Sequence, residues 1–114
     1  MKLIRLSLTL SSKEFMDNKG FKVMEFEITK ESDKTIFAYN EESQKKLKIL
    51  KNNILKIDTI FREDLYNIIT YSIYCYDTDL NKAKQILIDK ISEEVDKRKK
   101  SVAMLLKNLE LVSR

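Results

Sequence analysis

The sequence lacks several residue types on which catalytic and metal sites usually depend. Its 114 residues include no histidine, proline or tryptophan, one glycine and one cysteine. Histidine is the commonest general base near neutral pH and the commonest metal ligand, and one cysteine cannot build a zinc site. A single glycine cannot form a glycine-rich phosphate loop. We therefore expect a protein that is not an enzyme and has no catalytic residues, no metal and no cofactor.

The scarcity of cysteine and the absence of a long apolar run indicate where in the cell the protein is expected. The single cysteine, Cys75, excludes an internal disulfide and fits a reducing cytoplasm. Its position on the apolar side of a predicted strand indicates a small core residue rather than a reactive thiol. No run of 18 apolar residues occurs, so we expect no transmembrane helix and no membrane partner. The expected location is cytoplasmic.

The composition fits one folded domain over residues 1–114. The hydrophobic fraction of 43% argues against disorder, and the length allows a single modest core. A net charge of +4 and a pI near 9.1 permit binding of nucleic acid or anionic ligands without demanding it.

Residues 1–77 are expected to form mostly β sheet. Residues 45–56 fit both a helical stripe and a strand, and we interpret them as a short strand or turn leading into a strand over 54–61. Residues 11–20 are predicted to connect the first two strands. Four segments alternate polar and apolar residues, as half-buried strands do, at residues 2–10, 21–29, 35–39 and 68–76.

Residues 78–112 predict one long amphipathic helix, with Asp77 or Asp79 as its N-cap. Apolar residues recur along this helix at spacings of three, four and seven residues and form a seam on one side. Arg98 occupies one position of this seam. The resulting fold class is α+β, an antiparallel sheet of four to five strands followed by a long C-terminal amphipathic helix. The apolar seam residues are Ile88, Ile91, Val95, Val102, Leu105, Leu109 and Val112.

The length of this helix indicates association with another chain. At about 1.5 Å per residue it would extend about 50 Å, whereas a compact chain of this size has a radius of gyration of about 13 Å. Either the helix bends near residues 96–101, or its distal half projects and packs against a second copy. We favour projection, because the seam continues in phase and no glycine or proline marks a break. The predicted oligomer interface contains Val95, Arg98, Val102, Leu105, Leu109 and Val112.

A basic run offers a candidate binding site for nucleic acid, a nucleotide or an acidic partner. Clustered lysines release counterions when they contact phosphates, and aromatic rings on a strand can stack on bases. Alternatively, the lysines solubilise a surface loop and the tyrosines cover the sheet. The candidate binding residues are Lys45, Lys46, Lys48, Lys51, Lys56, Tyr74 and Tyr76.

Several of these features together resemble small accessory proteins of phages and mobile elements in low-GC Gram-positive bacteria. They are the alternating N-terminal sheet, the run Lys-Ile-Asp-Thr-Ile-Phe-Arg at 56–62, the tyrosine-rich strand ending at residue 77, and the long charged helix. Such proteins often act stoichiometrically against host systems, as CRISPR inhibitors or as sponges for nucleotide immune signals. The resemblance implies an anti-defence role and assigns no individual residues.

The leading hypothesis is a non-catalytic, homo-oligomeric binding protein, a dimer or larger. As a phage anti-defence factor it would occlude a host immune protein or sequester a nucleotide signal. One alternative is a nucleic-acid-binding regulator that uses the basic run at 45–56. Another is a structural subunit of a larger assembly that docks through residues 102–112.

Overall fold

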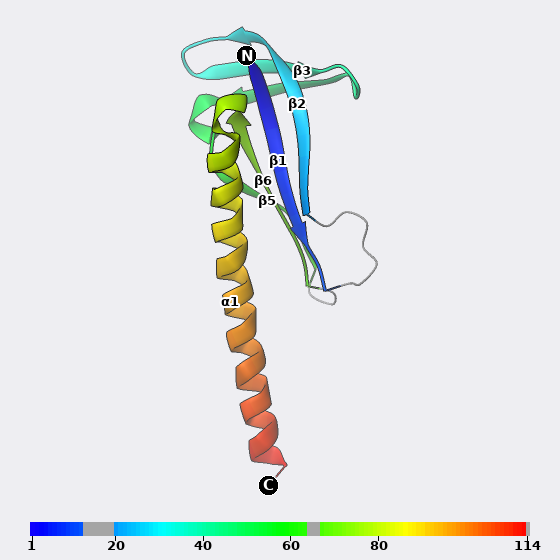
Figure 1. Cartoon of the computed structure of the whole chain (residues 1–114), viewed down its shortest axis with the longest axis vertical. Helices are drawn as coiled ribbons and strands as arrows, with labels where there is room; N and C mark the ends of the chain where they lie inside the picture. The colour runs from blue at the N-terminus through cyan, green and yellow to red at the C-terminus, as the bar shows by residue number, and fades with distance from the viewer. Residues whose placement is uncertain (13–19, 64–66, 114) are drawn as a thin grey trace.

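The computed structural model describes residues 1–12, 20–63 and 67–113, and it contains one antiparallel sheet and one long helix (Figure 1). The predicted α+β class is confirmed. Most of the predicted connection at 11–20 lies outside the described residues. The strands are β1 Lys2–Leu10, β2 Gly20–Glu31, β3 Thr35–Asn40, β4 Lys45–Leu50, β5 Ile57–Glu63 and β6 Ile68–Tyr76, and the helix is α1 Leu80–Val112.

The sheet has the strand order β4-β3-β2-β1-β6-β5, with every neighbouring pair antiparallel. The prediction of four to five strands was therefore too low. It failed over residues 45–56, where apolar residues at spacings of three and four also suit a helix. In the structure Leu47 and Ile49 point into the core at a period of two, while Leu50 remains 51% exposed. Tertiary packing selects the strand period here.

The first half of α1 covers one face of β1 and β6. Alternate residues of the two strands point toward the helix. They pack against Ala83, Leu87 and Ile91 of the helix. All three helix residues are at most 3% exposed. This first core cluster joins the chain's C-terminal element to its N-terminal strand. On the strands it contains Ile4, Leu6, Leu8, Ile69, Tyr71, Ile73 and Cys75.

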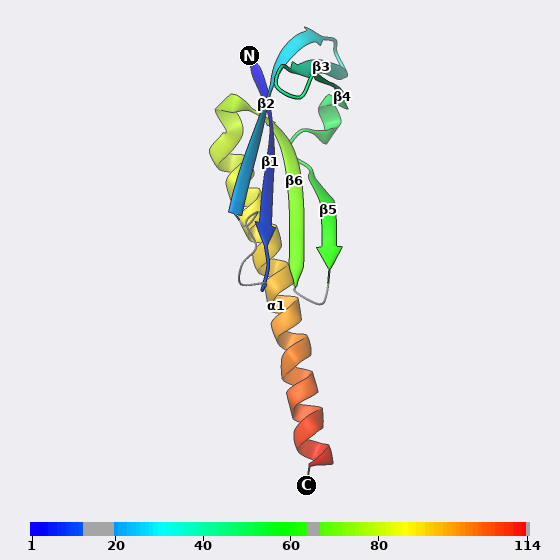
Figure 2. The ribbon, with the colours of Figure 1, turned by 90° about the vertical axis from the view of Figure 1, so that its right-hand side faces the viewer.

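A second core cluster lies where the sheet curls at the end opposite the tip of α1 (Figure 2). The curl brings the segment after β4 back to β6, where the Leu55 amide donates a hydrogen bond to the Tyr74 carbonyl oxygen at 2.8 Å. One 3-10 turn, Lys51–Asn53, makes this return. The buried members of the second cluster are Leu3, Phe26, Ile36, Ala38 and Ile49.

The start of α1 follows a 3-10 turn, Asp77–Asp79. Asp79 occupies the N-cap position, as one of the two predictions had it, but its side chain makes no capping hydrogen bond. The preceding tight turn replaces the expected carboxylate cap at this end.

The helix is continuous over 33 residues, so it does not fold back near residues 96–101 as the alternative had it. The distal half projects as expected, and its packing against a second copy stays a prediction. The distal half of α1 extends past the sheet toward the C-terminus (Figures 1 and 2). The molecule consequently measures 66 × 29 × 20 Å with a radius of gyration of 18.2 Å, well above the value of about 13 Å for a compact chain of this length.

Candidate functional site

The distal half of α1 is the most exposed apolar surface of the described chain. Every residue from 99 to 113 is exposed. Large apolar side chains are normally buried by the fold, so a row of them exposed on a helix is a candidate interaction surface. We call five of them the distal stripe: Val102, Leu105, Leu106, Leu109 and Val112, which are 54–80% exposed.

The distal stripe continues the face of α1 that packs on the sheet. Leu105, Leu109 and Val112 each follow a buried position by 18 residues, which is about five whole turns at 3.6 residues per turn. Those buried positions are Leu87, Ile91 and Glu94. The same side of the helix is therefore covered by the sheet in the first half and uncovered in the second.

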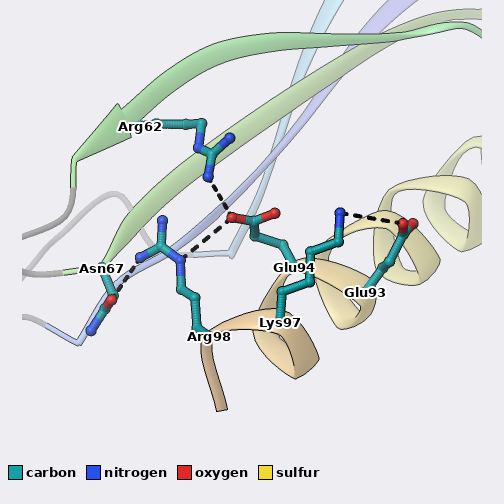
Figure 3. Close-up of polar contacts among 6 residues, drawn as sticks. All are labelled: Arg62, Asn67, Glu93, Glu94, Lys97 and Arg98. Carbon is teal, nitrogen blue, oxygen red and sulfur yellow. Dashed lines mark hydrogen bonds and ion pairs between the residues drawn. The ribbon is translucent and has the colours of Figure 1, made fainter. Parts of the chain in front are cut away.

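A polar network marks the point where the sheet ends and the free helix begins (Figure 3). Arg62 on β5 donates from Nη2 to Oε1 of Glu94 at 2.6 Å. Arg98 lies one turn further along α1, with Nε 3.6 Å from the same oxygen, and its Nη1 donates to Oδ1 of Asn67 at 2.6 Å. The Glu94 side chain is only 11% exposed. These bonds fix the direction in which the distal half leaves the domain.

The exposed ion pair beside this network, Glu93 with Lys97, differs from it. Nζ of Lys97 lies 3.8 Å from Oε1 of Glu93, and both side chains are more than half exposed. Such a pair contributes little to stability, because water solvates both charges.

A mostly apolar groove of about 610 Å³ lies between the end of the sheet and α1, beside the network, and Asn67 and Arg98 of the network contribute to its lining. Leu10 and Ile69 line it from the sheet, and Val102, Ala103 and Leu106 line it from the helix. The groove joins the distal stripe without interruption, since Val102 and Leu106 belong to both.

The predicted interface residues divide into two groups. Val102, Leu105, Leu109 and Val112 are exposed on the free helix. Val95 instead packs partly against the first core cluster, and Arg98 is held within its own chain by Glu94 and Asn67. Sequence reasoning missed Leu106, which lies next to the seam and lines the groove. Its spacing of three and four from Leu109 and Val102 was the signal that could have found it.

The predicted basic run lies along an edge of the sheet. Exposed lysines on an edge strand discourage pairing with other strands, which is one role for this group. Lys51 has a further contact, because its Nζ lies 3.3 Å from Oε1 of Glu31. Lys45, Lys46 and Lys48 are exposed on β4, and Lys56 is exposed in the connection to β5.

The two predicted tyrosines pack inward rather than standing in the open. Tyr74 and Tyr76 are half-buried beside the second core cluster. The Tyr76 hydroxyl donates to Oε1 of Glu31 at 3.0 Å. This hydrogen bond and the nearby Lys51 ammonium lower the pKa of the Glu31 carboxyl. Glu31 thus links β2, β6 and the end of β4, which closes the curl.

A different pair of aromatic rings faces the lysines. In the β3–β4 pairing Phe37 lies opposite Lys48, and Tyr39 lies opposite Lys46. Nζ of Lys48 is 5.8 Å from the centre of the Phe37 ring, within the range of a cation–π contact. The sequence did not reveal this face, because it depends on the register of the hairpin.

No helix among residues 1–12, 20–63 and 67–113 has a stretch long and apolar enough to cross a lipid bilayer. Within the same residues, no three side chains of the types His, Cys, Asp or Glu come together in a way that could hold a metal ion. Comparisons of the chain with protein families, with curated proteins and with solved structures found no match.

Proposed function

We propose that this chain is a non-catalytic binding protein that works as a homo-oligomer, and that the distal half of α1 joins its copies. The observation that carries the proposal is the continuation of the sheet-facing apolar stripe past the end of the sheet. A helix of 33 residues that needed only to cover β1 and β6 could stop near Arg98. The remaining turns instead present leucines and valines to solvent.

The physical driving force is burial of the distal stripe. Full burial of a Leu or Val side chain is worth about 1.5–3 kcal/mol. Each stripe residue has more than half of its surface still to bury. A second copy offers the same surface in return, so one contact buries both stripes.

The class of target in this proposal comes from the resemblance to anti-defence proteins. The homo-oligomer would bind a host immune protein or a nucleotide signal and act by occlusion or sequestration. No group on the chain needs to react in that role. Stoichiometric inhibition that saturates at a fixed ratio of protein to target is the expected behaviour.

The test compares two exposed leucines of the free helix. Leu105→Asp places a charge in the distal stripe, whereas Leu111→Asp places one on the other side, five turns beyond the exposed Glu93. Size exclusion with light scattering should show an oligomer for the natural chain and for Leu111→Asp, and a monomer for Leu105→Asp. Circular dichroism should be unchanged in all three. Equal masses for the two variants would refute the proposal.

Nucleic-acid binding is a second candidate function, and the aromatic–lysine face of the β3–β4 hairpin favours it. Phe37 and Tyr39 with Lys46 and Lys48 combine aromatic rings with positive charge, as proteins that bind single-stranded nucleic acid do. Lys46→Glu with Lys48→Glu should then weaken binding of a single-stranded oligonucleotide. The slope of log K against log salt concentration should become less negative by about 1.4, at roughly 0.7 for each lost phosphate contact.

The matched control reverses two other exposed lysines, Lys34→Glu with Lys82→Glu, which carry the same change of net charge. If both double variants weaken binding equally, general electrostatic attraction explains it and the face has no specific role.

A further inference from the structure

We propose that two copies associate by antiparallel pairing of their distal helices, and that the last turn of each α1 occupies the groove beneath the other copy's sheet. This inference rests on the proposed function, because it specifies the occupant of the distal stripe as a second copy and gives its orientation.

The sheet excludes a parallel arrangement. The distal stripe lies on the side of α1 that Ala83, Leu87 and Ile91 turn toward the sheet in the first half. A second helix on the stripe in parallel would have to continue into the space that the first copy's own sheet fills. An antiparallel helix ends where that sheet begins, and its own domain lies beyond the tip of the first helix.

Charge along α1 favours the same orientation. Residues 97–100 read Lys-Arg-Lys-Lys, four consecutive cations. Parallel pairing would set the two runs side by side. In an antiparallel pair centred between Val102 and Leu105 the runs are roughly 15 Å apart along the helices at 1.5 Å per residue. That separation exceeds the Debye length of about 8 Å at physiological salt, so their repulsion is largely screened.

The groove accommodates the end of the second helix. In the antiparallel register, Val112 of the second copy reaches the level of Val95, beside Leu10 and Ile69. The apolar lining that α1 and the sheet leave open there is then covered by apolar side chains of the second copy.

The extent of contact is that of a small specific interface. Ten stripe side chains from two copies would remove roughly 600–1,000 Å² of apolar surface from water, at about 60–100 Å² each. The two grooves and the lysine stems beside the seam bring the total toward the roughly 1,200 Å² at which specific interfaces begin. The overlap over residues 95–112 is about 27 Å long.

Distances between paired spin labels test the orientation in the full-length dimer. Ser92→Cys places a label on an exposed position of α1, outside the proposed overlap of residues 95–112. The antiparallel dimer separates the two labels by about 35 Å along the helices, and labels at Lys107→Cys by about 10 Å. A parallel dimer would bring both pairs within about 20 Å.

The native cysteine does not interfere with this labelling. Cys75 is fully buried, and burial raises the pKa of its thiol to about 11. The unsubstituted chain, treated identically, should take up no label.

A pair of leucine variants tests the groove itself. Leu10→Asp should raise the dimer dissociation constant about 10- to 100-fold, because it places a carboxylate against an apolar helix end. Leu50→Asp alters another exposed leucine, 51% exposed against 38% for Leu10, at the end of β4 and far from the groove. It should change the dimer dissociation constant less than about threefold. Circular dichroism confirms that both variants fold.

The outcomes separate this inference from the proposed function. A dimer with a long Ser92 distance and a selective effect at Leu10 supports both. A dimer with short distances at both label positions, or with no effect at Leu10, overturns the antiparallel model and leaves the homo-oligomer intact. A monomer at concentrations of about 100 μM, where a micromolar dimer would be formed, overturns both.

Discussion

Replacing Glu94 by glutamine tests whether the polar network fixes the helix to the sheet. The substitution keeps the shape of the side chain and one carbonyl acceptor but removes the charge that Arg62 and Arg98 share. A hydrogen bond to a charged group is worth about 1.5–3 kcal/mol, and a neutral one about 0.5–1.5. The Arg62 side chain is 52% exposed and regains water, which reduces the loss. We expect the free energy of unfolding to fall by about 1–3 kcal/mol.

The matched control is Glu93→Gln, one residue away. Its partner Lys97 lies at 3.8 Å and both side chains are exposed, so the expected loss is below about 0.5 kcal/mol. Urea unfolding of both variants at one protein concentration measures the difference, since oligomerisation makes stability depend on concentration. Equal losses for the two variants, or a loss below about 0.5 kcal/mol for Glu94→Gln, would contradict the reasoning.

Three further outcomes follow from burial and exposure. Leu87→Ala should cost about 2–5 kcal/mol in urea unfolding, because it opens a cavity under α1, whereas Ile88→Ala, at a 40% exposed site, should cost less than about 1. The free energy of unfolding should fall as pH rises from 9 to 11, because the Cys75 thiol has a pKa of 9.0 when unfolded and about 11 when folded; Cys75→Ala should flatten that slope, and an unchanged slope would contradict it. A chain ending at residue 99 should be monomeric and keep its sheet, because every residue from 99 to 113 is exposed; loss of the sheet signal would show that the distal turns support the domain.

Strong periodicity was enough to predict the central elements. The strands at 2–10 and 68–76 and the helix at 78–112 match β1, β6 and α1 closely. Their alternation or helical spacing persists over many residues, so each segment fits only one type of secondary structure. At residues 45–56 the apolar spacing fits two periods, and only the contact of Leu47 and Ile49 with the second cluster decides between them.

The candidate binding residues were predictable by type but not by position. The sequence indicates a basic run and two tyrosines, but strand neighbours are set by pairing between distant segments. That pairing sends Tyr74 and Tyr76 into the second cluster and places Phe37 and Tyr39 beside the lysines instead. The register of β3 against β4 cannot be predicted from a pattern within either strand alone.

The sequence by itself determined the α+β class, the length of α1 and the unbroken phase of its seam, because these depend on short-range periodicity. Only the tertiary structure decided where the sheet stops covering that seam. The boundary is set by the ends of β5 and β6, by Arg62 and Asn67 meeting Glu94 and Arg98, and by the curl that keeps the other strands away. The sequence pattern of an apolar seam is the same whether the sheet of the same chain or a second copy covers it. Burial depends on which distant segments the fold brings near the helix.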